Sequence, residues 1–252
     1  MKQLKKSAII IGRQPIIEAL NSEKHIDRIF LLRTATGDIV HQIKQLANSR
    51  NIPVNLVPAE KLDSLTRGNH QGCVGLVGLV QYLDLQDVIS LVVEKGQTPL
   101  FLILDGITDV RNIGAIARSA VCCGAQAIII ADKGVAPLNE DAMKASAGAL
   151  EKVQICRVPY LNKVLDTLHL NGIQVFASDM NMGKPLFECN LVDPVAFIIG
   201  SEDKGILSGL KNSADGLFHI PMSKDFDSFN VSVAAGIILY ESFKQRMLQG
   251  SL

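Results

Sequence analysis

Three short segments of this 252-residue chain combine small and polar residues in patterns that suit the binding of a small ligand. They are residues 112–118 (NIGAIAR), 200–205 (GSEDKG) and 228–232 (SFNVS). Each comes after a short apolar run, where a strand is expected to end. Such loops present backbone N–H groups, hydroxyls, amides and a carboxylate to a ligand. We therefore predict that the chemistry of the chain lies in these segments, at a point where the fold brings them together.

Arg118 is the cation of the first segment, and Asn112 lies at the mouth of the same predicted helix. The residues around Arg118 are apolar and can hold its stem, and a guanidinium binds phosphate in a forked, two-point way. Arg118 is thus a candidate for holding an anionic substrate. The alternative is a structural arginine that pairs with Asp105 or Asp109.

The second segment begins and ends with glycines, Gly200 and Gly205, which allow a backbone to approach a ligand closely. Glu202 and Asp203 between them repel phosphate, and the segment does not match the G-x-x-x-x-G-K-[ST] pattern of phosphate loops. A carboxylate here suits a neutral or cationic ligand, or a polar anchor for neighbouring loops. The alternative is a simple turn between a strand and a helix.

In the third segment, Ser228 or Asn230 suits the N-cap of a long helix, and capping alone explains either residue. Neither Ser228 nor Ser232 has a nearby histidine, and no G-x-S-x-G is present, so a hydrolase triad is not indicated. None of the histidines forms a close pair suited to a metal. The helix carries a broad apolar face that fits core packing or a dimer seam, made of Val233, Ile237, Ile238, Tyr240 and Phe243.

The elements that must position these segments alternate between strand and helix from Thr98 onward. Strands are predicted at 100–104, 127–131, 153–156, 174–177, 195–199 and 217–220, and helices near 113–123, 140–150, 160–170, 204–211 and 230–247. This alternation predicts an α/β fold with an open, largely parallel sheet and helices on both sides. Ligands of such sheets bind outside the carboxyl ends of the strands.

The front of the chain has its own pattern. Residues 8–78 predict a small α/β unit with helices near 12–20 and 39–49 and strands at 26–32, 54–57 and 73–80. Residues 81–97 hold one short helical pattern and a polar break, and we interpret them as an inter-domain linker. The predicted domains are therefore 1–80 and 98–252, joined by a linker at 81–97.

Charge is distributed unevenly, although Lys and Arg balance Asp and Glu at 25 each. Residues 1–78 contain 11 Lys and Arg against 6 Asp and Glu, whereas residues 79–252 contain 14 against 19. A basic front suggests that it meets a polyanion, although ordinary surface variation also produces such a difference. With no tryptophan and 5% aromatic residues, an aromatic platform for stacking bases is not expected.

The five cysteines form no C-x-x-C pair, which indicates buried thiols in a reducing cytoplasm and not a disulfide framework. The apolar run after the basic start is too short for a signal peptide, and no run has the length needed to cross a bilayer. We expect a cytoplasmic protein.

In order along the chain, N-x-G-x-x-x-R-S-A (112–120), G-S-E-D-K-G-I (200–206), and I-P-M with S-F-N-V-S-V-A (220–234) resemble three signature motifs. They are those of the SpoU, or TrmH-like, branch of the SPOUT RNA methyltransferases, and the resemblance covers about residues 98–250. The segments 12–20 (GRQPIIEAL) and 70–72 (HQG) are similar to the small substrate-binding domain of rRNA ribose methyltransferases in this branch. Lys224 stands where the family usually has glycine, and Phe229 where it usually has leucine.

The resemblance implies a SPOUT domain with a deep trefoil knot, S-adenosylmethionine as cofactor, no metal, and a homodimer that shares its active site. It implies transfer of a methyl group to a ribose 2′-hydroxyl in structured RNA, with 23S rRNA favoured over tRNA because the front domain is present. Polar active-site positions match Asn112, Arg118, Glu202, Ser228 and Asn230. Cofactor positions match Gly200, Ile220 and Phe229, with Ser178, Gly205 and Met222 beside them.

Two other function classes remain to be weighed. A non-catalytic RNA-binding factor of ribosome assembly would keep the fold without the chemistry, but the polar positions are all present. A dinucleotide oxidoreductase would need G-x-G-x-x-G after a first strand, and the chain has none there.

Overall fold

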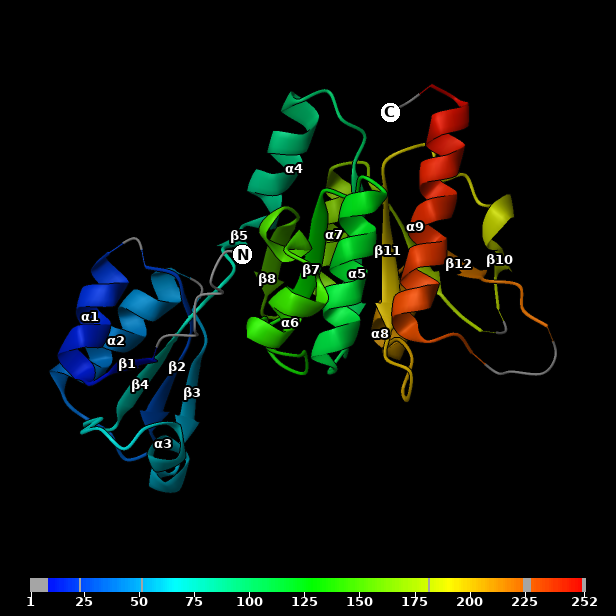
Figure 1. Cartoon of the computed structure of the whole chain (residues 1–252). Coiled ribbons are helices and arrows are strands. Elements are labelled where there is room, and N and C mark those ends of the chain that lie inside the picture. Colours follow the sequence, from blue (N-terminus) through cyan, green and yellow to red (C-terminus); the bar gives the residue numbers. More distant parts are fainter. Residues whose placement is uncertain (1–8, 23, 51, 181, 224–227, 251–252) are drawn as a thin grey trace. The chain divides into compact units, whose positions relative to one another are not determined.

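The computed structural model describes residues 9–22, 24–50, 52–180, 182–223 and 228–250. The chain divides into two compact units (Figure 1). The first extends to Gln81 and includes Leu138–Glu140, and the second comprises Tyr82–Pro137 and the residues from Asp141 onward.

The first unit contains a four-stranded sheet with the strand order β1-β4-β2-β3. β2 pairs with β3 in parallel, and the other two pairings are antiparallel. The elements in chain order are β1 (Ile9–Ile11), α1 (Arg13–Asn21), β2 (Ile26–Leu32), α2 (Asp38–Ser49), β3 (Val54–Val57), α3 (Ala59–Leu65) and β4 (Cys73–Val77).

Both faces of this small sheet are covered, because alternate residues of β2 point to opposite sides. Ile29 and Leu31 pack in a core with residues of α1 and α2, whereas Phe30 packs with Leu62 of α3. The unit therefore has its own hydrophobic core.

The second unit is built on an eight-stranded sheet with the order β10-β12-β9-β11-β6-β7-β8-β5, and its described pairings are parallel. Its strands are β5 (Tyr82–Leu83), β6 (Leu100–Asp105), β7 (Ala127–Ala131), β8 (Gln154–Val158), β9 (Gln174–Ser178), β10 (Lys184–Pro185), β11 (Val195–Gly200) and β12 (Gly216–His219). Its helices are α4 (Leu85–Glu94), α5 (Val110–Cys122), α6 (Glu140–Ala145), η1 (Ala149–Glu151), α7 (Asn162–Leu170), η2 (Leu186–Glu188), α8 (Ser208–Asn212) and α9 (Val231–Leu248). This arrangement confirms the predicted α/β fold with a parallel sheet.

Helices cover both faces of the large sheet, so its central strands are apolar on both sides. α4, α7 and α8 pack with Phe101 and Ile103 of β6 on one face. α5 and α9 lie side by side on the other face, where α9 contacts β11 and α5 contacts β7 (Figure 1).

Strand register brings the ends of the motif strands to one edge. Gly200, the last residue of β11, is paired with Asp105, the last residue of β6. On the other side of β11, Ser178 of β9 is paired with Phe218 of β12. The loops after all four strands therefore leave the sheet at its carboxyl edge, where a ligand site is expected.

The interpretation of residues 81–97 as a linker is wrong. Tyr82 of β5 pairs with β8, and the Arg157 guanidinium lies 3.5 Å from the centre of its ring. α4 follows, its N-cap Asp84 accepting hydrogen bonds from the next backbone N–H groups. The apolar side chains of α4 recur at helical spacing and are buried in the core of the second unit, because this stripe needs a covered face.

Some element boundaries also differ from those predicted. The helix expected near 204–211 is α8, which begins at Ser208 because the Gly205 N–H donates to the Ser201 carbonyl and closes a turn first. The helix expected over 140–150 is divided into α6 and η1. Five short elements, β1, α3, β5, β10 and η2, were not predicted.

A buried arginine fixes the end of α9 to the sheet. Arg246 donates hydrogen bonds to backbone carbonyls of Thr98, Pro99, Leu191 and Asp193 at 2.8–3.1 Å. Burial lowers the pKa of Arg246 to about 10, so the group is charged at neutral pH.

None of the helices in the described ranges is long and apolar enough to cross a membrane.

Candidate active site

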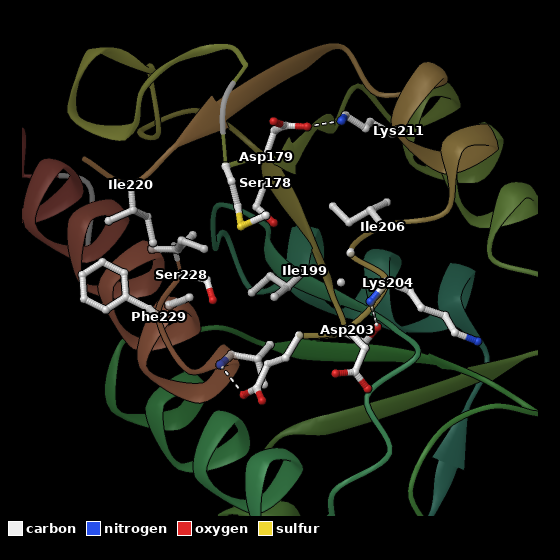
Figure 2. Close-up of a pocket in the computed structure, with 18 of the residues that line it drawn as sticks. Ser178, Asp179, Ile199, Asp203, Lys204, Ile206, Lys211, Ile220, Ser228 and Phe229 are labelled. Atoms are coloured by element: carbon white, nitrogen blue, oxygen red, sulfur yellow. Dashed lines mark hydrogen bonds and ion pairs between the residues drawn. The ribbon is translucent and has the colours of Figure 1, made fainter. Parts of the chain in front are cut away.

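A cavity of about 530 Å³ opens at the carboxyl edge of the large sheet. Figure 2 shows Ile220 and Phe229 on one side of it and Ile206 and Lys211 on the other. Its lining comes from five places in the chain: the end of β9 and the residues after it, the 199–206 segment, Lys211 of α8, the segment after β12, and the start of α9.

Most residues predicted for the site line this cavity. All six predicted cofactor positions do so, together with two of the predicted polar positions. They are Ser178, Gly200, Gly205, Ile220, Met222 and Phe229, with Glu202 and Ser228. Segments separated by up to about fifty residues of sequence thus form one wall.

A hydrogen-bond network joins the three motif segments beside the cavity. The Asn230 Nδ2 group donates to Glu202 Oε1 at 2.7 Å and to Asn112 Oδ1 at 3.3 Å. The Val231 N–H donates to the same Glu202 oxygen at 3.0 Å. The Glu202 carboxylate therefore acts as the polar anchor of neighbouring loops, one of the two roles predicted for it.

Asn230 holds a second position in this network, because it is the N-cap of α9. Its Oδ1 accepts from the Ser232 N–H at 2.9 Å and from the Ser232 hydroxyl at 2.6 Å. One amide therefore starts the helix with its oxygen and ties the helix to the other loops with its nitrogen.

The structure explains Gly200 and Gly205 of the second segment by a close backbone contact and a positive φ, which the sequence did not predict. A Cβ on Gly200 would lie 2.2 Å from the Gly205 carbonyl carbon, so the turn closes on itself at this point. Gly205 has φ +65°, which side chains rarely accept. The pair is therefore needed for the turn that presents Glu202, and both glycines also line the cavity.

Arg118 does not line the cavity. It lies six residues beyond Asn112 along α5 and is exposed, and no hydrogen bond or ion pair of it is seen among the described residues. The alternative pairings are not formed, because Asp109 pairs with Arg111 and Asp105 accepts from the Leu207 N–H at 2.8 Å. The exposed guanidinium is thus available to another molecule.

The sequence did not predict the ion pair between Asp179 and Lys211 in the cavity wall (Figure 2). Asp179 directly follows the predicted cofactor residue Ser178 at the end of β9, a position that could have indicated it. Lys211 lies near the end of α8, and no local pattern in the sequence points to it. The cavity therefore carries lysines as well as carboxylates.

Lys224, one of the two departures from the family pattern, lies outside the described residues. Within the described part of the chain, no group of three or more His, Cys, Asp or Glu side chains is placed to hold a metal ion.

Two family models match this chain. The model of the SpoU rRNA methylase family matches residues 99–240, and a model described as RNA 2′-O ribose methyltransferase substrate binding matches residues 9–83. A putative TrmH family tRNA/rRNA methyltransferase, YacO of Bacillus subtilis, is 34% identical over 237 residues, covering 94% of this chain and 95% of that protein. A relative of the same description from Staphylococcus saprophyticus is 32% identical over 94% of this chain and 96% of its own.

Solved structures of similar fold include the SpoU methyltransferase AviRb of Streptomyces viridochromogenes in complex with AdoMet. It has a TM-score of 0.62 at 23% identity and covers 95% of this chain and 90% of its own. An AdoMet-bound rRNA methyltransferase of Sinorhizobium meliloti has a TM-score of 0.61 at 24% identity, over 95% and 87%. From the family models and the relatives of similar sequence, this chain belongs to the SpoU methylase family, whose members use S-adenosylmethionine.

Proposed function

We propose that this chain methylates a ribose 2′-hydroxyl in structured RNA, and that the RNA is 23S rRNA. The observation that carries the proposal is the junction of the three motif segments through Glu202 and Asn230 beside one cavity. The match of the front unit to a 2′-O ribose methyltransferase substrate-binding model supports ribose as the target.

The cavity fits S-adenosylmethionine in size and charge. Its volume of about 530 Å³ lies within the range of about 300–1,000 Å³ that is usual for small-molecule sites. Ile199, Ile220 and Phe229 offer an apolar wall for a nucleoside, and Asp179, Lys211 and Glu202 offer charges for a zwitterion with a cationic sulfur.

When bound, the cofactor supplies a methyl group already activated by its positive sulfur. Glu202 and Asn230 hold the loops around it, and Ser228 lies at the cavity where the ribose would enter. Arg118 orients the target nucleotide through its phosphate and stabilises the negative charge that grows on the 2′-oxygen. The hydroxyl proton passes to water as the oxygen–carbon bond forms and the carbon–sulfur bond breaks.

For Arg118 to act, we propose that it reaches the cavity of a second copy in a homodimer. Arg118 is exposed on α5, and the adjacent helix α9 exposes Val233 and Tyr240, one heptad apart. An apolar stripe of this kind on a long helix suits a self-complementary interface. Tyr240 and Val233 would then form its seam.

Three further assignments belong to this proposal. We also propose that the second unit contains the trefoil knot of the family. The reaction takes place in the cytoplasm, which suits the free thiols of the five cysteines. tRNA is the alternative substrate, since the names of the relatives give both RNAs.

The test combines one substitution with a matched control on the same helix. Arg118→Ala should lower the rate of 2′-O-methylation of rRNA, taken from cells lacking this gene, by about a hundredfold. Its affinity for S-adenosylmethionine, measured by isothermal titration, should stay unchanged. Arg111→Ala removes another exposed arginine of α5 and should methylate normally. A normal rate in the Arg118 variant would refute the assigned role, and a chain that binds RNA without binding the cofactor would be a non-catalytic RNA-binding factor.

A further inference from the structure

The two motifs of the front unit meet at one place in its structure. Residues 12–20 and 70–72 are about fifty residues apart in sequence. The Arg13 Nε group donates to the Gln71 carbonyl at 2.9 Å, and the Arg13 N–H donates to Gln71 Oε1 at 3.4 Å. None of the chemistry proposed for the second unit uses these residues.

A second cavity, of about 520 Å³, opens where the motifs meet. It is lined by side chains of two kinds, polar ones from the motifs and apolar ones from the end of β2 and the start of α2. They are Arg13, Gln14 and Gln71 with Leu32 and Ile39, and Gly72 closes the wall. Ile39 is 42% exposed, so its side chain is accessible to a ligand in the cavity.

The turn that carries Gln71 is held in a costly conformation. Gln71 has φ +49°, a region where a residue other than glycine is uncommon. His70 fixes the turn, because its Nδ1 accepts from the Gly72 N–H at 3.0 Å and its Nε2 bonds to Asp63 at 3.0 Å. Glycine would relieve this strain, whereas the glutamine side chain places its Oε1 beside the Arg13 N–H at the cavity.

These groups match the parts of a nucleotide. Leu32 and Ile39 offer an apolar surface for the face of a base, Gln14 and Gln71 offer amide donors and acceptors for its edge, and Arg13 offers a cation for its phosphate. The excess of Lys and Arg in residues 1–78 favours a polyanionic partner. The base must be unpaired, because paired bases in an A-form duplex keep their edges out of reach of such a cavity.

We propose that this cavity binds one unpaired nucleotide of the substrate RNA. The front unit thereby selects a loop or bulge, and not a continuous duplex, for the second unit to methylate. This inference rests on the proposed function for the identity of the ligand as RNA, and it adds the residues and the kind of nucleotide that the front unit reads.

The experiment uses the full chain and an RNA hairpin whose loop of unpaired uridines carries one 4-thiouridine. The competitor is the same stem extended as a continuous duplex. We expect tighter binding of the hairpin, and a photocrosslink from the loop to the peptides that contain residues 13–14 or 71–72. The double variant Gln71→Gly, Ile39→Ser should bind the hairpin about tenfold more weakly, since a good base contact contributes about that much.

The variants are chosen to keep the fold. Glycine accepts the φ of Gln71 without strain, and Ile39 is already exposed. The control Leu56→Ser changes another apolar side chain of the same unit, 49% exposed and outside the cavity, and should bind the hairpin as the unmodified chain does.

Equal affinity for hairpin and duplex, or unchanged hairpin affinity in the double variant, would overturn this site alone. S-adenosylmethionine affinity, measured on the same samples, should be the same in all variants. An unmodified chain that failed to bind S-adenosylmethionine would instead refute the proposed function.

Discussion

The Glu202 carboxylate is the residue on which the geometry of the candidate site depends most directly. One of its oxygens accepts hydrogen bonds from the Asn230 side chain and from the Val231 backbone. Hydrogen bonds to a charged group contribute about 1.5–3 kcal/mol. Removal of the carboxylate also deprives the Asn230 side chain and the Val231 N–H of this acceptor. Loss of the carboxylate should therefore disorder the cavity wall more than it lowers the free energy of unfolding.

Glu202→Ala should lower the affinity for S-adenosylmethionine at least about tenfold, which corresponds to about 1.4 kcal/mol. Isothermal titration measures this directly. Glu94→Ala, at the end of α4 and outside the cavity, is the matched control and should bind the cofactor normally. Cofactor affinity retained in the Glu202 variant would show that the network does not shape the cavity.

Burial also decides the behaviour of the cysteines. It raises the pKa values of Cys73 and Cys156 to about 12, although Arg13 acts in the opposite direction on Cys73. Cys122 is exposed. Because the thiolate is the reactive form, a thiol reagent at mild alkaline pH should label Cys122 in the folded chain and reach Cys73 and Cys156 only after unfolding.

The same shifts predict a loss of stability with pH. Both folded-state pKa values lie above the ordinary value of 9.0, so the unfolded chain gives up these protons first. The contribution of the two thiols is complete below pH 9.0 and is lost as the pH rises toward about 12. Urea unfolding across this range measures it, and a smaller loss of stability after replacement of both cysteines by alanine would identify them as a source.

Among the elements, α5 and α9 carry two of the motif segments. Packing of these two helices against each other fixes the position of one segment beside the other. Gly114 of α5 allows close approach of the backbone after α6, since a Cβ there would lie 2.5 Å from Ala145 Cβ and 2.8 Å from the Ser146 nitrogen. Gly236 of α9 faces α5 more loosely, and a Cβ there would lie 3.5 Å from Ser119 Oγ. The glycine of the first motif is thus a packing residue.

This contrast predicts opposite outcomes for the same substitution. Gly114→Ala should lower the free energy of unfolding by about 2 kcal/mol, because overpacking of this size exceeds the gain in helix propensity. Gly236→Ala should leave it unchanged or raise it by up to about 1 kcal/mol. Urea denaturation of both variants is the measurement, and equal effects would contradict the packing described for Gly114.

At the scale of the assembled protein, the proposed dimer is the feature with the largest consequence for activity. Tyr240→Glu places a charge in the proposed seam on α9 and should convert the dimer to a monomer in analytical ultracentrifugation. Methylation should fall with it, since the monomer lacks the second copy's Arg118, while the chain stays folded. Tyr160→Glu is the matched control, because Tyr160 is also strongly exposed but precedes α7 on another face. A Tyr240 variant that stayed dimeric would place the interface elsewhere.

The two units are predicted to bind different ligands. The second holds the proposed cofactor cavity, and the first carries the basic excess and the cavity at Arg13 and Gln71. Contacts to phosphate weaken as salt rises, so the affinity of the full chain for RNA should fall with ionic strength while its affinity for the cofactor changes little.

Patterns within about ten residues of sequence could be interpreted correctly from the sequence. The alternating strands and helices, the Asn230 cap and the grouping of most predicted site residues around one cavity depend on local periodicity, turn chemistry and motifs. The bounds of β2 and β3 agree with those predicted. The motif order also placed the segments at strand ends, which a parallel sheet gathers at one edge.

The features that only the tertiary structure decided are contacts between residues distant in sequence. The Asp179–Lys211 pair, the carbonyls around Arg246 and the tight contact at Gly114 join residues 30 or more apart, and no local pattern encodes such pairs. α4 showed its helical pattern in the sequence, but only its burial against the sheet made it part of the second unit. The separation of Arg118 from the cavity has the same origin: position along a helix is set locally, whereas the surface that a side chain faces is set by how the helices pack.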